Sequence, residues 1–365
     1  LPLSTSIKKS FQRLQNHPKP TPPPIKAIMN SHIFIVHTAF QELIAEASAA
    51  SIKKNSPTDL VILASEIPLS EKNHPIWNNR IQLKNIEPSS FGKNKETVYE
   101  ENILKLKLST QDKNRKTLYI SDIQWPFNNR LFFDKNINKE NDFNMIIDGT
   151  LAYYNPQKTA LSYFKDTIKH VAGIIGLGLQ YKPYLGSVMG WERKRIKLIY
   201  GLNLKLSPIP QEKHRNIEQE IIQFGELDKN KSIFLDQPFH NHMSAPDIQS
   251  LSVDTYNFIK KQGLANTFYK AHHFSKNEYK NTYGFNNENI LNTTECIEKL
   301  IGHYGFGTVI SYNSTALFTL KTIYQDQIRC ISLRDCSLRM KINPASAKKI
   351  DTLFYKSGVE IHEIG

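Results

Sequence analysis

The sequence predicts an α/β protein with two Rossmann-like domains that face each other across a cleft. Short apolar strands alternate with helical stretches along the chain, which is the pattern of parallel βαβ units. The strands form two sets, one in each half of the chain. A length of 365 residues also exceeds what one ordinary hydrophobic core needs, so two domains are expected.

The first set of strands begins after residue 30. Its members are short runs of β-branched and aromatic residues, which are typical of buried parallel strands. A helical pattern rich in Ala, Leu and Glu follows the first strand, from Phe40 to Ser51. The predicted strands are His32–Val36, Asp59–Ala64, Leu118–Ile120 and Met145–Ile147.

The second set starts near residue 231, after a mostly helical stretch whose end we place in Leu206–Pro210. Its predicted strands are Ser232–Leu235, Thr267–Tyr269, Thr308–Ile310 and Ile328–Leu333. We therefore expect an extension over residues 1–29, a first domain over 30–210 and a second domain over 211–365. We also expect the final helix to pack back on the first domain.

The chain carries a formal charge of +13, with basic clusters near its start and at Arg193–Lys197. Residues 1–30 hold five Lys or Arg and no acid, and a proline-rich stretch over 18–24 separates the basic tract from the body. No aromatic-interleaved stripe or familiar nucleic-acid motif accompanies this charge. We predict no nucleic-acid partner, and peripheral contact of residues 1–24 with an anionic membrane.

Hydropathy, cysteines and histidines indicate where the protein is located and whether it binds a metal. No apolar run approaches the roughly 20 residues of a membrane-spanning helix, and the polar, basic opening has no secretory signal, so we expect a cytoplasmic protein at the inner face of the membrane. The odd number of cysteines (Cys296, Cys330 and Cys336) predicts unpaired thiols. No acid or cysteine cluster completes a zinc site with His240 and His242, so a loop that lines the cleft is expected there, without metal.

Polar residues follow three of the predicted strands, where open α/β sheets bind ligands. Asp148 precedes a glycine and can accept a proton from an attacking hydroxyl. His272 and His273 can protonate or stabilise a leaving phosphate. Ser314 and Thr315 open a helix, whose N–H groups and hydroxyls bind phosphate. Taken alone, each motif has a structural explanation: a turn, packed histidines and a helix cap. Taken together, they predict displacement of a phosphate-linked group by a hydroxyl.

In this order, the three elements resemble the acidic-Gly, His-Pro and Ser-Ser/Thr motifs of bacterial sialyltransferases and polysialyltransferases. The resemblance spans roughly residues 30 to 335 and implies the two-domain GT-B fold. It implies that Asp148 is the general base and that His272 is the general acid or the phosphate-stabilising histidine. It also implies that Ser314 and Thr315 hold the phosphate of CMP.

Two further segments carry the same resemblance. Glu298 lies 26 residues after His272 and 16 before Ser314, and it resembles the carboxylate that binds the ribose hydroxyls of cytidine in that family. Gln237 and Pro238 resemble the turn that opens the family's nucleotide-binding domain.

The motifs also depart from the family at two positions. Ile147 stands where the family has a first acid, and His273 stands where it has the proline. The choice between His272 and His273 therefore stays open. One branch of the family takes its base from the loop after the Gln-Pro strand, which makes Asp236 a reserve base.

The resemblance implies inverting transfer of sialic acid from CMP-sialic acid to a hydroxyl of a cell-surface glycan, such as lipooligosaccharide or capsule. The partners are then a CMP-sugar donor and a glycan acceptor, and no cofactor is expected because a CMP-sugar has one phosphate. Kdo or another nonulosonic acid, such as pseudaminic or legionaminic acid, is the alternative sugar. A basic nucleic-acid-binding or non-catalytic protein is the alternative from a different class.

Overall fold

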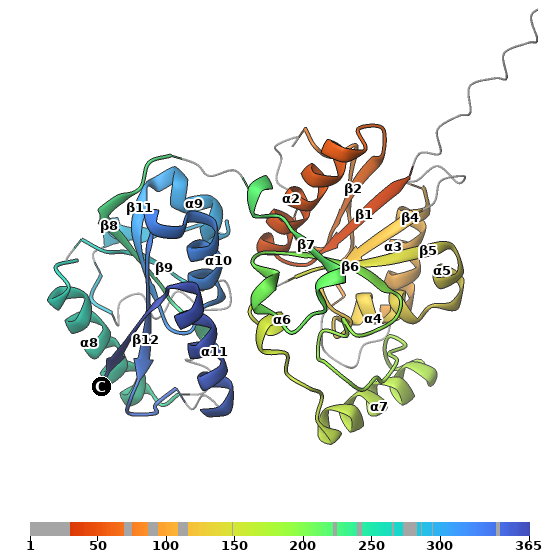
Figure 1. The fold of residues 1–365 in the computed structure, drawn as a ribbon. Helices are drawn as coiled ribbons and strands as arrows, with labels where there is room; N and C mark the ends of the chain where they lie inside the picture. The colour runs from red at the N-terminus through yellow and green to blue at the C-terminus, as the bar shows by residue number, and fades with distance from the viewer. Residues whose placement is uncertain are drawn as a thin grey trace, which may run out of the picture.

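The chain forms two α/β domains that lie side by side, as the sequence predicts (Figure 1). A computed structural model describes residues 30–68, 75–86, 94–108, 116–147, 149–221, 225–238, 243–264, 266–272, 283–285, 287–293, 295–340 and 344–365. Within the two sheets of this described part, neighbouring strands pair in parallel.

The first domain is built on a seven-stranded sheet in the order β3-β2-β1-β4-β5-β6-β7. Its strands are β1 (Ser31–Val36), β2 (Leu60–Ser65), β3 (Asn79–Gln82), β4 (Lys116–Ile120), β5 (Asn141–Ile146), β6 (Ile196–Gly201) and β7 (His214–Asn216). The central strands are apolar because helices cover both faces of a parallel sheet. Phe34, Ile35 and Val36 of β1 are accordingly fully buried.

Helices α2 to α7 connect these strands. They are α2 (Ala39–Asn55), α3 (Lys95–Leu108), α4 (Pro126–Phe133), α5 (Lys135–Glu140), α6 (Leu151–Tyr154) and α7 (Ala160–Ile174). Helix α2 begins at Thr38, whose Oγ1 accepts a hydrogen bond of 3.2 Å from the Gln41 N–H. This N-cap starts the helix directly after β1, at the carboxyl edge of the sheet.

The second domain has a six-stranded sheet in the order β10-β9-β8-β11-β12-β13. Its strands are β8 (Asp228–Leu235), β9 (Phe268–Lys270), β10 (Ile290–Leu291), β11 (Phe306–Ser311), β12 (Arg329–Asp335) and β13 (Glu360–Ile364). Its helices are α8 (Ala245–Lys261), α9 (Ile297–Tyr304), α10 (Thr315–Tyr324) and α11 (Pro344–Ser357). Short 3-10 helices are η1 (Leu204–Leu206), η2 (Gln211–Lys213), η3 (Glu218–Glu220), η6 (Asn287–Asn289) and η7 (Gln325–Gln327).

Every predicted strand overlaps an observed one, but five observed strands were not predicted. These are β3, β6, β7, β10 and β13, of which β3, β7, β10 and β13 lie at a sheet edge. Strand β6 falls inside the stretch that the sequence predicted as mostly helical. It overlaps the end of the basic cluster Arg193–Lys197, and that run of charge masks the apolar pattern of the strand.

The predicted domain boundary at residue 210 is too early. Strand β7 lies beyond it in the sequence yet pairs with β6 of the first sheet. The η3 turn that follows also contacts α2. The chain therefore leaves the first domain between Ile221 and Asp228, where β8 starts the second sheet.

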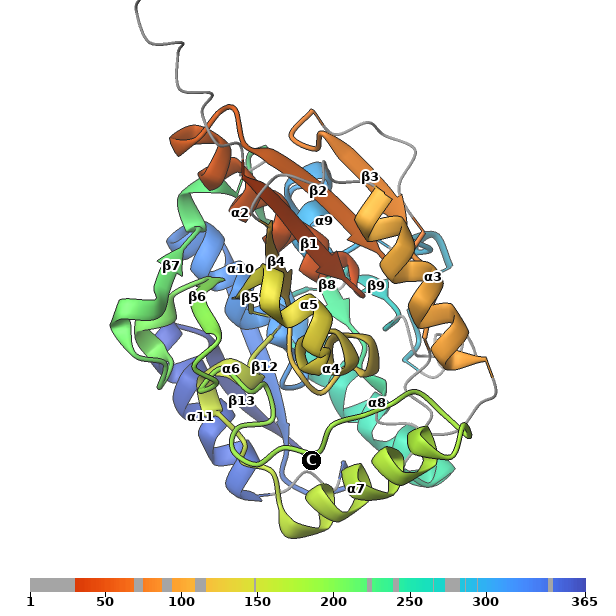
Figure 2. The same ribbon diagram turned by 90° about the vertical axis from the view of Figure 1, so that its right-hand side faces the viewer.

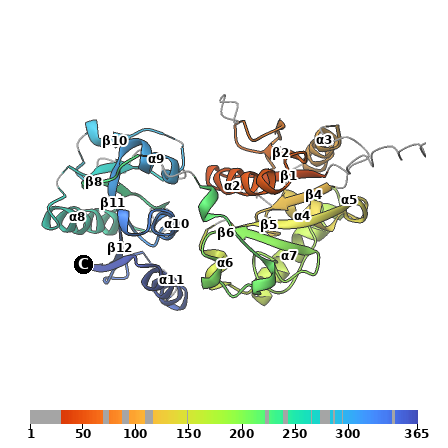
Figure 3. The ribbon, with the colours of Figure 1, turned by 45° about the horizontal axis from the view of Figure 1, so that its top comes forward.

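Among the described residues, the two domains contact each other on the side of α2 and α6 (Figure 3). Lys299 of α9 forms an ion pair of 3.0 Å with Glu46 of α2. The rings of Tyr153 and Phe318 lie 4.5 Å apart between centroids, and α11, the final helix, contacts α6. A further contact, between Thr150 and Thr315, belongs to the candidate site.

Several predictions concern residues outside the described part of the chain. They are the membrane contact of residues 1–24, Asp148, His240, His242 and His273. Within the described ranges, no helix is long and apolar enough to cross a membrane.

Candidate active site

The turn after β5 reaches across to the start of α10 in the other domain. The Thr150 N–H and Oγ1 each lie 3.4 Å from Thr315 Oγ1. The first and third predicted motifs therefore meet, although 165 residues separate them in the sequence. Asp148 itself lies outside the described residues, and Ile147 and Gly149 on either side of it belong to this edge of the sheet.

Gly149 has a backbone geometry that favours glycine. Its φ is +76°, a left-handed conformation that residues with a Cβ adopt at a cost. A Cβ built at this position would lie 3.2 Å from Thr315 Oγ1, tighter than ordinary packing allows. The glycine next to Asp148 thus permits both the turn and the close approach of the two domains.

The N-terminus of α10 lies at the carboxyl edge of the second sheet. Ser314 is its N-cap, and the Ser314 Oγ accepts a hydrogen bond of 3.3 Å from the Ala316 N–H. The positive end of a helix dipole and its first N–H groups stabilise an anion in this position. Ser314 can therefore contact a phosphate, while the Thr315 hydroxyl contacts the first domain.

Glu298 lies in the first turn of α9, close to α10. Its carboxyl group is buried, and Oε1 accepts a hydrogen bond of 2.6 Å from Thr319 Oγ1. Burial raises the pKa of Glu298 above its ordinary value of 4.5, while the Thr319 hydroxyl and the charge of Lys270 act in the opposite direction. A carboxylate in this position can accept hydrogen bonds from ribose hydroxyls.

We expect cytidine binding to weaken as the pH falls from neutral through the raised pKa of Glu298. Protonation replaces an acceptor oxygen with a donor, so the affinity depends on the ionised form and is greatest above that pKa. Calorimetric titration with cytidine at successive pH values measures the effect. The Glu298→Gln variant is the control, because it cannot titrate at this position. An unchanged pH profile in that variant would remove Glu298 from the ribose site.

The second motif lies at the end of β9, beside β8. His272 is half-buried, two residues beyond β9. Gln237 and Pro238 follow β8 after one intervening residue, Asp236, and are also half-buried. The two strand ends adjoin, since the Asp236 N–H donates a 3.0 Å hydrogen bond to the Lys270 carbonyl. This places His272 and the Gln-Pro turn at one edge of the second sheet.

Asp236 has a fully buried carboxylate, only 1% exposed. Tyr269 donates a hydrogen bond of 2.6 Å to one oxygen, and Tyr283 donates one of 3.1 Å to the other. The Gln237 N–H donates a third, of 2.8 Å. A carboxylate enclosed by donors anchors the strand end, so the geometry favours a structural role over the reserve-base role that we expected.

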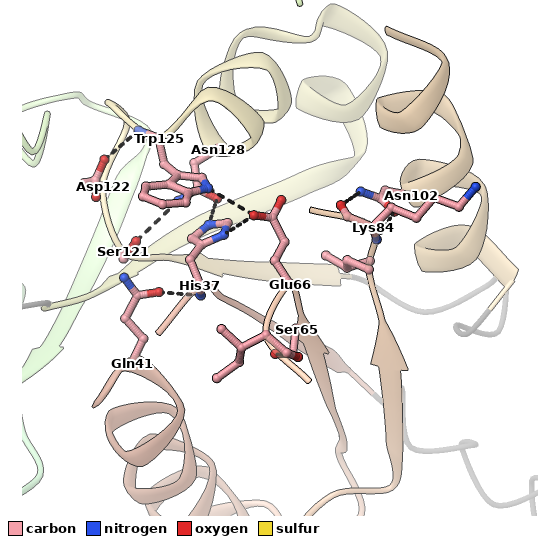
Figure 4. Close-up of polar contacts among 12 residues, drawn as sticks. His37, Gln41, Ser65, Glu66, Lys84, Asn102, Ser121, Asp122, Trp125 and Asn128 are labelled. Atoms are coloured by element: carbon pink, nitrogen blue, oxygen red, sulfur yellow. Dashed lines mark hydrogen bonds and ion pairs between the residues drawn. The ribbon is translucent and has the colours of Figure 1, made fainter. Parts of the chain in front are cut away.

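A polar cluster that the sequence analysis missed lies at the carboxyl ends of β1, β2 and β4 (Figure 4). His37 follows β1 and Glu66 follows β2, and the His37 Nδ1 lies 3.0 Å from Glu66 Oε2. The His37 Nε2 lies 3.1 Å from Asn128 Oδ1, so oxygens hold the ring from both sides. The indole N–H of Trp125 donates to Glu66 Oε2 at 3.2 Å.

The cluster also contains a stacked ring pair and a second carboxyl group. The rings of His37 and Trp125 stack with centroids 4.6 Å apart. Asp122 follows β4 and accepts a hydrogen bond from the backbone N–H of Trp125. Burial raises the pKa of Asp122. Glu66 Oε1 is buried and lacks a hydrogen-bond partner within the described part of the chain. Inspecting the residues after these three strands, as we did for later strands, would have identified the cluster.

The three cysteines of the chain are free thiols. Cys330 is buried, Cys336 is exposed, and none of the three cysteines is in a disulfide. Burial raises the pKa of Cys296, at the N-cap of α9, to about 12, so its thiol is a weak nucleophile at neutral pH. The described residues contain no group of three His, Cys, Asp or Glu side chains that could hold a metal ion.

Comparison with solved structures identifies the fold. The 2,6-sialyltransferase of Photobacterium sp. JT-ISH-224, solved with CMP and lactose, matches with a TM-score of 0.54 and 13% identity over 91% of this chain and 78% of that one. A sialyltransferase from Photobacterium damsela matches with a TM-score of 0.51 and 11% identity over 92% of this chain and 81% of that one. The protein has the GT-B fold.

This GT-B fold does not by itself select a reaction. A UDP-N-acetylglucosamine 2-epimerase matches with a TM-score of 0.50 and 8% identity over 92% of this chain and 83% of that chain. No family model matches the sequence, and no curated protein matches it. The reaction must therefore be argued from the residues of the site.

Proposed function

We propose that the protein is an inverting glycosyltransferase that transfers a sialic acid from CMP-sialic acid to a hydroxyl of an acceptor glycan. The contact of Thr150 with Thr315 carries this proposal. It brings the turn next to Asp148 against the helix start at Ser314, and these are two motifs of the sialyltransferase resemblance. With Asp148 as the proton acceptor and the start of α10 as the phosphate site, this contact supports a reaction at the junction of the two domains.

The proposed reaction is a single displacement at the anomeric carbon of the donor. The acceptor oxygen forms its bond to this carbon as the bond to the phosphate oxygen breaks, and Asp148 takes the hydroxyl proton. Negative charge develops on the phosphate of CMP. The α10 N-terminus with Ser314 stabilises this charge, and His272 donates a proton or a hydrogen bond to it.

The first domain supplies features that suit a glycan acceptor. Trp125 presents a large amphipathic ring, and Asp122 and Glu66 provide carboxylate oxygens at the same sheet edge as the turn after β5. Aromatic rings pack on the apolar faces of sugars, and carboxylates accept hydrogen bonds from sugar hydroxyls. We assign the acceptor to this edge and the CMP group to the second domain.

We expect Ser314→Ala to weaken CMP binding by about 1–2 kcal/mol, because it removes a hydroxyl at the phosphate. The same change also removes the N-cap of α10, which costs about 1 kcal/mol of stability. Ser244→Ala is the matched control, since Ser244 caps α8 by accepting from the Asp247 N–H at 3.3 Å. Calorimetry with CMP that shows equal affinity in both variants would contradict the phosphate role of Ser314.

The proposed function is tested by a screen for CMP release from CMP-sialic acid, CMP-Kdo and other CMP-nonulosonates, each with a panel of glycans. We expect acceptor-dependent release from CMP-sialic acid. Release from another CMP-sugar alone would change the sugar and keep the reaction class. Epimerisation of UDP-N-acetylglucosamine, with no release of CMP from any CMP-sugar, would show that the protein is an epimerase. Binding of RNA or DNA with steep salt dependence, without CMP-sugar turnover, would favour the basic binding protein.

A further inference from the structure

Helix α7 lies on the outside of the first domain, apart from its sheet (Figure 2). Its sequence has one apolar face and one polar face. In most surface helices the apolar face packs on the core and the polar face contacts water. In α7 the orientation is reversed.

The polar face of α7 packs on the protein. Asp166 is buried and forms an ion pair with Lys158, whose Nζ lies 3.7 Å from the centroid of the Tyr184 ring. Lys169, one turn after Asp166, lies over the ring of Tyr181 at 5.1 Å. Breaking a buried ion pair is costly, so these contacts fix the rotation of the helix about its axis.

A close backbone approach fixes the end of the same helix. A Cβ at Gly173 would lie 2.7 Å from the Gln180 Cα and 2.8 Å from the Leu179 carbonyl oxygen. A larger residue does not fit there without displacing the backbone. The orientation of α7 is therefore determined at both ends by tight packing.

The apolar face of α7 consequently faces outward. Its residues are spaced by three or four positions, and their exposed fractions range from 44% for Ile168 to 65% for Ile174. Two neighbouring apolar side chains, at 177 and 185, are also exposed. The exposed residues of this face are Leu161, Phe164, Ile168, Val171, Ile174 and Ile175. An apolar stripe of this length on a surface indicates a binding partner.

The charged residues near this stripe indicate which kind of partner it binds. Residues 151–197 contain eight Lys or Arg and two acids. One acid, Asp166, faces inward; the other, Glu192, accepts a hydrogen bond from the Ser187 N–H. Lys165, beside Phe164 on the helix, is exposed. Lys158 is paired with Asp166, and the cluster at 194–197 lines a hollow with Glu140 and Asp142 near the start of β5. The exposed charge on the helix itself is therefore that of Lys165, with no exposed acid beside it on α7.

A second copy of the chain fits this surface poorly. Two α7 helices paired through their apolar stripes would bring the exposed Lys165 of each copy into the interface, without an exposed acid on the helix to compensate. Like charges across an interface disfavour association. An anionic bilayer instead supplies both an apolar interior for the stripe and negative headgroups for the lysines.

We propose that α7 is an interfacial membrane-binding helix, which inserts its apolar stripe into the surface of an anionic bilayer. The lysines beside the stripe then lie at the level of the phosphate headgroups. This contact is separate from the one expected for residues 1–24. It does not depend on the proposed reaction, because it concerns lipid binding alone.

The test is flotation of the full chain with vesicles of phosphatidylcholine, with and without phosphatidylglycerol. We expect binding to the anionic vesicles that weakens with added salt, and a loss of about tenfold or more in the Phe164→Gln/Ile168→Gln variant. Both side chains are largely exposed, so this variant should unfold at the same temperature as the wild type. The matched control is Val253→Gln/Tyr355→Gln, which replaces exposed apolar residues of the second domain.

Three results would overturn the proposal. One is no binding of the wild type to anionic vesicles. Another is equal binding by the Phe164→Gln/Ile168→Gln variant, which would assign the membrane contact to another part of the chain, such as residues 1–24. The third is a wild-type dimer in sedimentation experiments that this variant converts to a monomer, without vesicle binding; the stripe would then bind a second copy.

Discussion

Asp148→Asn is expected to lower the rate of sugar transfer by about 10²-fold or more, with CMP affinity nearly unchanged. Asparagine keeps the shape of the side chain and cannot accept the proton of the acceptor hydroxyl. The contact of Thr150 with Thr315 should persist, because the substitution leaves the backbone of the turn intact. Steady-state transfer and calorimetry with CMP measure the two quantities separately.

Asp236→Asn is the informative comparison for this variant. Tyr269 and Tyr283 both donate hydrogen bonds to the Asp236 carboxylate, and an amide group provides a single acceptor oxygen. We expect a loss of about 1–3 kcal/mol in the free energy of unfolding, with transfer retained in the folded fraction. If Asp236→Asn is folded and inactive while Asp148→Asn is active, Asp236 is the base.

His272→Asn is expected to lower kcat by about 10²-fold, because the leaving phosphate loses its proton or hydrogen-bond donor. His273→Asn is the matched control, and we expect it to retain most of the activity. Full pH–rate profiles separate an effect on catalysis from an effect on folding. The limb of the kcat profile that reports ionisation of the histidine should disappear only in the His272 variant. The reverse pattern would assign the role to His273 and shift the motif by one residue.

The catalytic roles proposed for Asp148 and His272 both depend on strand ends that can be predicted from the sequence. Buried parallel strands need continuous apolar runs, so β1, β2, β5, β8 and β11 are recognisable from composition alone. The polar residues that follow such runs lie at the ligand-binding edge by the geometry of parallel sheets. From this relation the sequence predicts Asp148, His272 and Ser314 as site residues without knowledge of the tertiary structure.

Strands at or beside a sheet edge do not share this signal. Strands β6 and β7 contain or adjoin Lys, Arg and His residues, and β7 has only three residues, so their pattern is not that of a buried strand. Their pairing in the first sheet depends on neighbours that are distant in the sequence. The domain boundary was therefore misplaced for the same reason.

The sequence by itself determined the two-domain α/β class, the central strands and the strand ends after which the motif residues come. These features depend on the local periodicity of apolar residues, which can be read directly from the sequence. Only the tertiary structure decided that Thr150 meets Thr315, that two tyrosines enclose the Asp236 carboxylate, and that His37 pairs with Glu66. It also decided that the apolar face of α7 points outward. Each of these depends on which distant surfaces pack together, and residue spacing alone does not contain that information.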